Sequence, residues 1–183
     1  MSAAGDTLII PARLTADDLA SRIDREVEEV RAVLTARGEP DAAEDILGAE
    51  LAIEVSRTLG VAVTVESRDL ALERLYEYET RGEMDSDAGG RAGAIVEGVV
   101  SSLDELDEMI ESVAEHWTVA RMPVIDRNIL RIGVYELRSD PMTPTAVVIA
   151  EAVRLAHTYS TEKSSTFVNG VLATLAKTLR ETS

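Results

Sequence analysis

The chain contains no cysteine, which excludes a disulfide framework and a thiolate metal site. Its two histidines, His116 and His157, lie far apart in the sequence, so a histidine-based metal site is not expected. No apolar run approaches the ~20 residues that a membrane-spanning helix needs, and the first ten residues are too polar for a secretory signal. These absences predict a soluble cytoplasmic protein with no metal and no other cofactor.

Positive charge is also scarce, because 18 lysine and arginine residues stand against 34 acidic ones and the net charge is -16. A protein this acidic repels a polyanion at long range. Phosphate binding by counterion release is therefore not expected of the molecule as a whole. A local basic or aromatic patch can still bind RNA, but only weakly unless a partner contributes positive charge.

Apolar residues make up 45% of the chain and aromatic residues only 3%, which is typical of packed helices. Apolar positions recur at steps of three and four over most of the 183 residues. The predicted helices cover residues 15–37, 41–59, 67–79, 91–116, 123–137, 147–159 and 166–182. The segment Val61–Val65 is β-branched but has no evident partner strand, so we predict a linker. The predicted fold class is all-α, a bundle with short connections.

Several residues invite a packing interpretation. Gly170 in mid-helix costs about 1 kcal/mol relative to alanine, which a close approach between helices would explain. Asp126 near a helix start suits the helix dipole and is placed to pair with Arg131 or Arg154. Trp117, at a helix end, is interpreted as an anchor in the core.

Phe167 has two competing interpretations. It follows a polar segment, residues 160–166, which contains Lys163 and several hydroxyl groups. An aromatic ring beside a lysine and hydroxyls suits single-stranded RNA through base stacking and phosphate contacts. The alternative is that Phe167 belongs to the core. We find no nucleophile–base pair and no phosphate-binding glycine loop, so no catalysed reaction is predicted.

Three groups of residues, in this order and spacing, resemble the NusB family of transcription antitermination factors. They are Arg68–Leu72 with Leu75 and Tyr76; Asp126–Arg131 with Tyr135–Leu137; and Val148–Ala156, Ser160–Ser164 and Phe167–Leu172. The resemblance implies a NusB-like helical bundle over residues 66–183. Residues 1–65 then form an acidic N-terminal extension with two additional helices that packs on this core.

The resemblance also implies a function without catalysis. NusB proteins bind boxA, a single-stranded element of nascent ribosomal RNA, together with the small-subunit ribosomal protein NusE. The pair joins other Nus factors on RNA polymerase and suppresses termination. The family's RNA-binding face maps here to Arg68, Tyr76, Lys163, Thr166 and Phe167.

One departure from the family affects this expectation. NusB proteins usually carry an arginine-rich segment before the opening helix, and here Val61–Glu66 takes that place. The alternative function is therefore a NusB-fold protein-interaction module that has lost RNA binding. The extension also has an alternative role, in which it covers the RNA face as a mimic of nucleic-acid charge.

Overall fold

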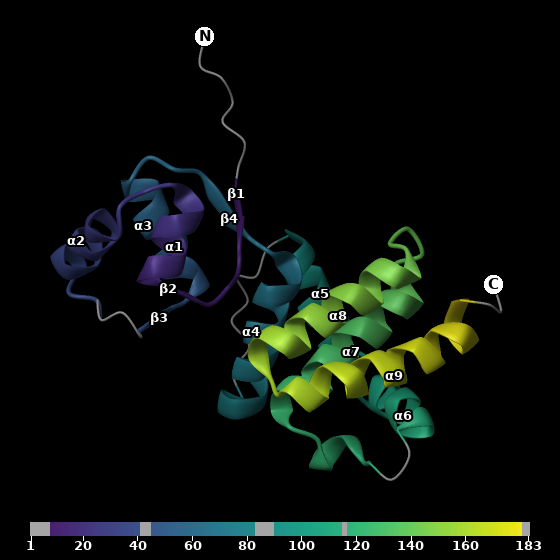
Figure 1. Ribbon diagram of the computed structural model, residues 1–183. Coiled ribbons are helices and arrows are strands. Elements are labelled where there is room, and N and C mark those ends of the chain that lie inside the picture. Colours follow the sequence, from purple (N-terminus) through teal and green to yellow (C-terminus); the bar gives the residue numbers. More distant parts are fainter. Residues whose placement is uncertain (1–7, 41–44, 83–89, 115–116, 181–183) are drawn as a thin grey trace. The chain divides into compact units, whose positions relative to one another are not determined.

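The computed structural model describes residues 8–40, 45–82, 90–114 and 117–180 (Figure 1). The chain divides into two compact units, Met1–Leu70 and Ala71–Ser183, and each is described by itself. The predicted helix start at Asp41 and most of the turn predicted at residues 85–90 lie outside the described residues. The helix predicted over residues 41–59 is wrong at Ile46–Leu47, which form a strand, and is confirmed over Ala49–Thr58.

The N-terminal unit combines helices with two pairs of short strands. Its elements are β1 (Leu8–Ile10), β2 (Leu14–Thr15), α1 (Ala16–Ile23), α2 (Val27–Arg37), β3 (Ile46–Leu47), α3 (Ala49–Thr58) and β4 (Val63–Val65). Strand β1 pairs with β4 in parallel, and β2 pairs with β3 antiparallel. The predicted linker is therefore wrong over Val63–Val65. Its partner strand lies more than fifty residues earlier, where a loose leader was expected.

The helix predicted over residues 15–37 is two helices, separated at Asp24. Asp24 has a left-handed backbone with φ of 55°, a conformation that aspartate tolerates better than most residues. The predicted start is confirmed, because the Thr15 side chain accepts the Asp18 N–H and the Asp18 carboxylate accepts the Thr15 N–H. The break lets the apolar faces of both helices reach one core.

That core belongs to the N-terminal unit itself. It contains Leu19 and Ile23 of α1, Val30 and Leu34 of α2, and Val55 of α3, all fully or almost fully buried. The apolar stripe of the extension is thus covered within its own unit. Packing of the extension on the rest of the protein stays a prediction.

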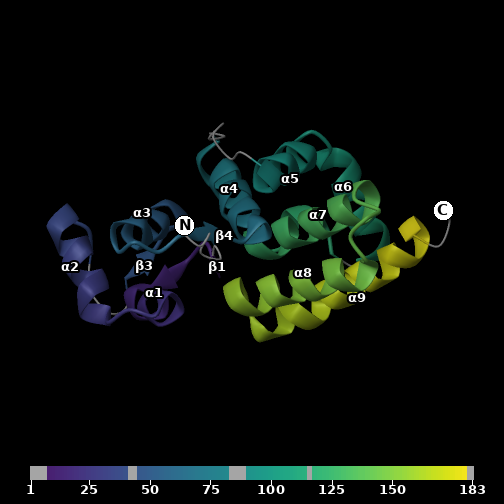
Figure 2. The same ribbon diagram turned by 90° about the horizontal axis from the view of Figure 1, so that it is seen from above.

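The C-terminal unit is a helical bundle. Its elements are α4 (Ser67–Arg81), which begins before the unit boundary, α5 (Gly90–Val100), α6 (Leu103–Val113), the 3₁₀ turn η1 (Val119–Arg121), α7 (Val124–Ser139), α8 (Thr145–Tyr159) and α9 (Glu162–Arg180). Helix α7 lies between the α5–α6 pair and the α8–α9 pair (Figure 2). The all-α fold class is confirmed for this unit, although the helix predicted over 91–116 divides at Ser101–Ser102.

The close helix approach expected at Gly170 occurs at other glycines. A Cβ at Gly98 would lie 2.1 Å from the Tyr135 ring, and one at Gly133 would lie 2.7 Å from Leu172 Cδ1. Gly170 is exposed and nothing would lie within 4 Å of its Cβ. The packing interpretation of Gly170 is therefore wrong.

We expect Gly170→Ala to raise the free energy of unfolding by up to about 1 kcal/mol, because alanine loses less backbone entropy in a helix. Gly98→Ala should instead lower it, because the new methyl group overlaps the Tyr135 ring. Urea denaturation of both variants checks the contrast. A destabilised Gly170→Ala protein would contradict it.

The turn between α7 and α8 is built around Asp140. Its carboxylate accepts the Thr143 hydroxyl at 2.7 Å and the Thr143 N–H at 3.2 Å. The hydroxyl bond is the largest cause that holds the pKa of Asp140 below its usual value, with the Arg91 guanidinium contributing. Arg180 of α9 donates to four carbonyl groups here, those of Glu136, Leu137, Asp140 and Thr143.

We expect Thr143→Val to lower the melting temperature at pH 7 and to lower it less near pH 3. A depressed pKa means that ionised Asp140 stabilises the fold above its unfolded pKa, and that this contribution is lost as the pH falls through the folded pKa. The variant loses the hydroxyl donor, so its loss in melting temperature should be larger where Asp140 is ionised and smaller where Asp140 is protonated. Thr174→Val is the control, because the Thr174 hydroxyl donates to the Gly170 carbonyl instead of a carboxylate. Equal deficits at both pH values would contradict the role of Asp140.

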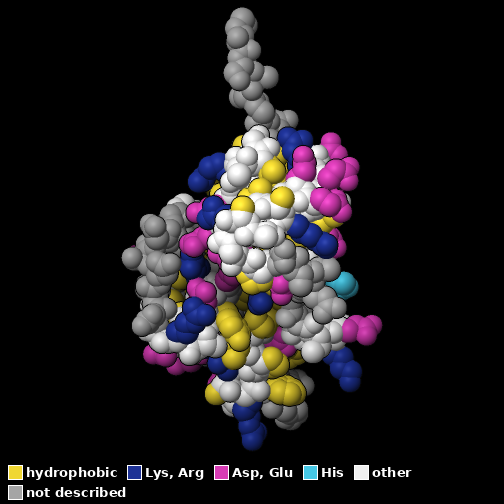
Figure 3. All heavy atoms as spheres, turned by 90° about the vertical axis from the view of Figure 1, so that its left-hand side faces the viewer, with side chains coloured by type: hydrophobic (Ala, Val, Ile, Leu, Met, Phe, Trp, Pro, Cys, Tyr) yellow, Lys and Arg dark blue, Asp and Glu magenta, His cyan; other side chains and the backbone are white. Residues whose placement is uncertain are grey.

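Negative charge is shared between the two units. Residues 1–70 hold 15 acidic and 7 basic side chains and residues 71–183 hold 19 and 11, a formal charge of -8 each. On the face drawn in Figure 3, acidic and basic side chains are interspersed, with small apolar patches between them. Among the described residues, no helix is long and apolar enough to cross a membrane.

Candidate RNA-binding surface

Two aromatic rings meet at the surface of the C-terminal unit. Trp117 is 51% exposed, and its ring centroid lies 6.4 Å from that of Phe167, with the planes tilted by 55°. Phe167 is half-buried and packs against the core of the unit. Trp117 is therefore not the core anchor that was predicted. Exposed aromatic area on an ordered framework is what stacking of an unpaired base requires.

Asp126 positions the helix that carries Phe167. Its carboxylate accepts the hydroxyl groups of Ser160 and Ser164, the latter at 2.8 Å, and both Asp126 and Ser164 are buried. Asp126 lies in the first turn of α7, where its charge also suits the helix dipole. The ion pair predicted with Arg131 or Arg154 is wrong, because Asp126 instead anchors the first turn of α9 to α7.

Residues 162–166 form the first turn of α9, so most of the predicted polar loop is helical. Lys163 and Thr166 are exposed there, and Lys163 precedes Phe167 by one helical turn, so both face the same side. The structure thus brings three of the predicted site residues together. Within the described part of the chain, the Lys163 ammonium has no acidic partner.

The segment that carries Trp117 is held by the end of α6. The Trp117 N–H donates to the Ala114 carbonyl, and the Val119 N–H donates to Glu111 Oε1 at 2.8 Å. Val119 is buried, while Arg121 at the end of η1 is exposed and has no acidic partner among the described residues. Trp117 and Arg121 are candidate site residues that the sequence analysis did not identify. The available signal was a lone tryptophan in a connection between helices.

The other two predicted site residues, Arg68 and Tyr76, lie on α4. Tyr76 is 40% exposed on α4. Arg68 is only 8% exposed, and its Nη1 lies 3.5 Å from Glu66 Oε1. A guanidinium held in this way is not free to contact phosphate, so we leave Arg68 out of the surface.

Glu66 holds the start of α4. Its Oε2 accepts the N–H groups of Arg68 at 2.6 Å and Asp69 at 3.1 Å, which satisfies two donors that the first helical turn leaves without a partner. Burial, followed by the hydrogen bond with the Asp69 side chain, raises the pKa of Glu66. The residues at the position of the family's arginine-rich segment, Val61–Glu66, thus include strand β4 and the carboxylate that caps helix α4.

The arginines of the motif Asp126–Arg131 serve packing. Arg131 donates Nε and Nη2 to the two oxygens of Asp107, each at 2.7 Å, and Nη1 to Glu79. Arg127 Nε lies 2.9 Å from the same Glu79 carboxylate. Burial alone would lower the pKa of Arg131, but the hydrogen bonds with Asp107 and Glu79 raise it. The network ties α4, α6 and α7 together.

The C-terminal unit is thus an all-helical bundle domain that carries one partly exposed aromatic pair; among the described residues, no cluster of three His, Asp or Glu side chains is placed to hold a metal ion. Residues 58–177 match the model of the NusB family. The chain belongs to the NusB family.

Individual relatives agree with this assignment. Transcription antitermination protein NusB of Clavibacter michiganensis is 39% identical over 135 residues, which cover 64% of this chain and 98% of that protein. The solved structure of NusB from T. maritima is 33% identical with a TM-score of 0.56, covering 61% of this chain and 88% of that one. A chain in the crystal structure of the antitermination factors NusB and NusE in complex with dsRNA is 30% identical with a TM-score of 0.54, covering 61% and 94%.

Proposed function

We propose that this protein is an RNA-binding transcription antitermination factor that binds boxA-type single-stranded RNA together with NusE. The observation that carries the proposal is the exposed Trp117 ring against Phe167, with Lys163 one helical turn before Phe167 and Arg121 four residues after Trp117, both without an acidic partner among the described residues. The names of the relatives support the antitermination role. Assembly with other Nus factors and RNA polymerase follows from the same role, and no chemical step is required.

The aromatic pair favours unpaired bases over a duplex. In an A-form helix the base faces are already stacked on one another, so a protein ring reaches them only at loops, bulges and ends. Thr166 and Lys163 on the adjacent turn of α9 then supply a hydroxyl donor and a charge for the backbone. The proposed surface consists of Trp117, Arg121, Lys163, Thr166 and Phe167.

Because the net charge of the chain is -16, tight RNA binding requires a partner that contributes positive charge. Two phosphate contacts, from Lys163 and Arg121, would give a logarithmic salt slope of only about -1.4 for a single strand. The remaining acidic surface repels the rest of the RNA. A basic partner such as NusE would supply the missing charge.

The test is a fluorescence-anisotropy titration of boxA RNA with the full chain, alone and with NusE, at several salt concentrations. We expect weak binding by the chain alone, at least tenfold tighter binding with NusE, and a shallow salt slope without NusE. A scrambled RNA of equal length is the control. Absence of specific RNA binding in both titrations would contradict the proposal.

The alternative is a NusB-fold protein-interaction module without RNA binding. One observation favours it, namely that Val61–Glu66 contains no arginine and the next arginine in the chain, Arg68, is buried against Glu66. The same titration separates the two functions, because the alternative requires NusE binding with no gain in RNA affinity.

A further inference from the structure

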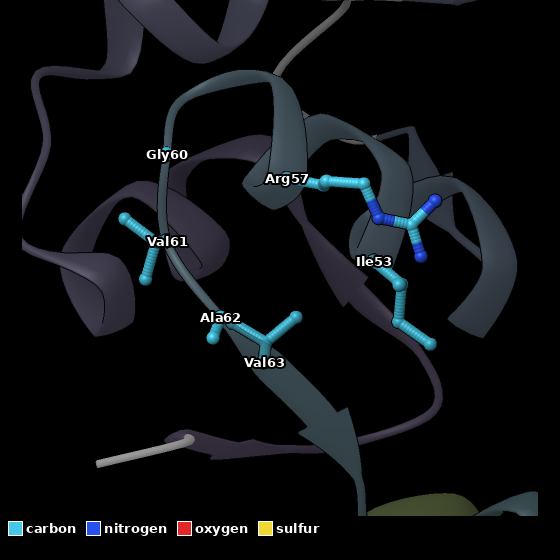
Figure 4. A pocket seen from close by; sticks show the side chains of 6 residues that line it. All are labelled: Ile53, Arg57, Gly60, Val61, Ala62 and Val63. Carbon is cyan, nitrogen blue, oxygen red and sulfur yellow. The ribbon is translucent and has the colours of Figure 1, made fainter. Parts of the chain in front are cut away.

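The N-terminal unit has an open groove between α3 and the segment that leads into β4. It is lined by Ile53 and Arg57 of α3 and by residues 60–63, and its volume is about 500 Å³ (Figure 4). The side chains of Ile53 and Arg57 lie across from this segment in Figure 4. The groove therefore combines an aliphatic lining with one guanidinium.

The strand beside the groove has an unpaired edge. The Leu8 N–H donates to the Ala62 carbonyl and the Glu66 N–H to the Ile10 carbonyl. Only alternate residues of a parallel strand bond to a given neighbour, so Val63 directs its N–H and C=O away from β1. Within the described residues these two groups have no strand partner, and Val63 also lines the groove.

The guanidinium in the groove is available to an anion. Three other arginines of this unit are paired, Arg31 with Asp17, Arg37 with Glu54 and Arg68 with Glu66, whereas the rest, like Arg57, have no acidic partner among the described residues. Arg57 is exposed and has no acidic partner among the described residues, although acidic residues outnumber basic ones 15 to 7 in this unit. A carboxylate of a bound partner would therefore form an ion pair with the Arg57 guanidinium, which no acidic residue of the described chain does.

We propose that this groove binds an extended acidic peptide segment of a partner protein, which adds as a strand to the free edge of β4. The Val63 N–H and C=O supply main-chain hydrogen bonds, an aliphatic side chain of the peptide contacts Ile53 and Val61, and a glutamate or aspartate pairs with Arg57. Strand addition of this kind takes its affinity from the main chain and its specificity from alternate side chains. A groove lined by one cation, Arg57, contacts too few phosphates to suit a nucleic acid.

The experiment is an NMR titration of the ¹⁵N-labelled full chain with acetyl-Val-Glu-Val-Glu-Val-amide. Acetyl-Val-Lys-Val-Lys-Val-amide is the matched probe, with the same β propensity and the opposite charge. The salt concentration is 0.15 M, where the Debye length is about 8 Å and long-range repulsion is screened. We expect the glutamate peptide to shift the amide signals of Ile53, Arg57 and residues 60–63, and the lysine peptide to leave them unchanged.

Two variants separate local from general charge effects. Arg57→Glu should weaken glutamate-peptide binding roughly tenfold, because it exchanges an attractive exposed pair for a repulsive one. Arg22→Glu changes the net charge equally, and Arg22 is exposed but does not line the groove. A peptide methylated on its central nitrogen should also bind more weakly. Shifts outside the groove, equal binding of the lysine peptide, or equal effects of the two variants would overturn the proposal.

Discussion

Replacing Arg131 with methionine is expected to lower the free energy of unfolding by about 3 kcal/mol, at the lower end of the range for breaking a buried ion pair. The Arg131 side chain is only 8% exposed and pairs with Asp107 and Glu79 at once. Methionine preserves most of the volume but leaves the two carboxylates without this partner. Arg127 then remains as the one described cation that contacts Glu79.

Urea denaturation of the full chain measures the effect, with Arg81→Met as the control. Arg81 makes an exposed pair with Glu77, with its side chain 72% exposed and a separation of 3.7 Å. Such pairs contribute about 0–1 kcal/mol, so the same substitution there should change the stability little. Equal losses in the two variants would mean that the Glu79–Arg131–Asp107 network does not join the helices as described.

Trp117→Ala is expected to weaken boxA binding by the NusE complex roughly tenfold. Stacking of one base on an aromatic ring contributes about 1–3 kcal/mol, and 1.4 kcal/mol corresponds to about tenfold in affinity. Trp117 is half exposed, so its removal costs little of the core, whereas Phe167 packs against that core. Substitution of Trp117 therefore tests RNA binding with less effect on folding than substitution of Phe167 would have.

Fluorescence anisotropy provides the measurement, and two further variants serve as controls. Trp117→Phe keeps a ring and should retain most of the affinity. Met142→Ala removes an apolar side chain that is 87% exposed outside the proposed surface, and it should change nothing. Unchanged affinity in Trp117→Ala would remove the aromatic pair from the RNA-binding surface.

The predictions that succeeded rest on contacts between neighbours in the sequence. The helical period marks the bundle helices, because residues three and four apart share a helix face. Thr15 and Asp18 form the predicted capping box, and Pro141 and Pro144 delimit the turn after α7. Family membership was also predictable, since the motifs span more than 100 residues in a set order.

The predictions that failed concern partners distant in the sequence. Val63–Val65 is a strand because Leu8–Ile10 lies beside it, and no local pattern indicates that partner. Gly170 is an exposed glycine, while Gly98 makes the close contact, because the helix axes decide which face is covered. Of the predicted site residues, Lys163, Thr166 and Phe167 lie together on α9 and Arg68 is buried, and their contact with RNA stays a prediction.

The sequence by itself determined the helices of the C-terminal unit, the NusB family and the acidity of both units, because periodicity, motif order and charge are properties of the chain. Only the tertiary structure decided which charged side chains and aromatic rings are exposed and unpaired, and so available to bind a ligand. Glu66 removes Arg68 from the surface, Asp126 fixes the start of α9, and no carboxylate within the described chain reaches Lys163 or Arg57. Availability depends on which side chains become neighbours when the helices pack, and packing joins residues that are far apart in the sequence.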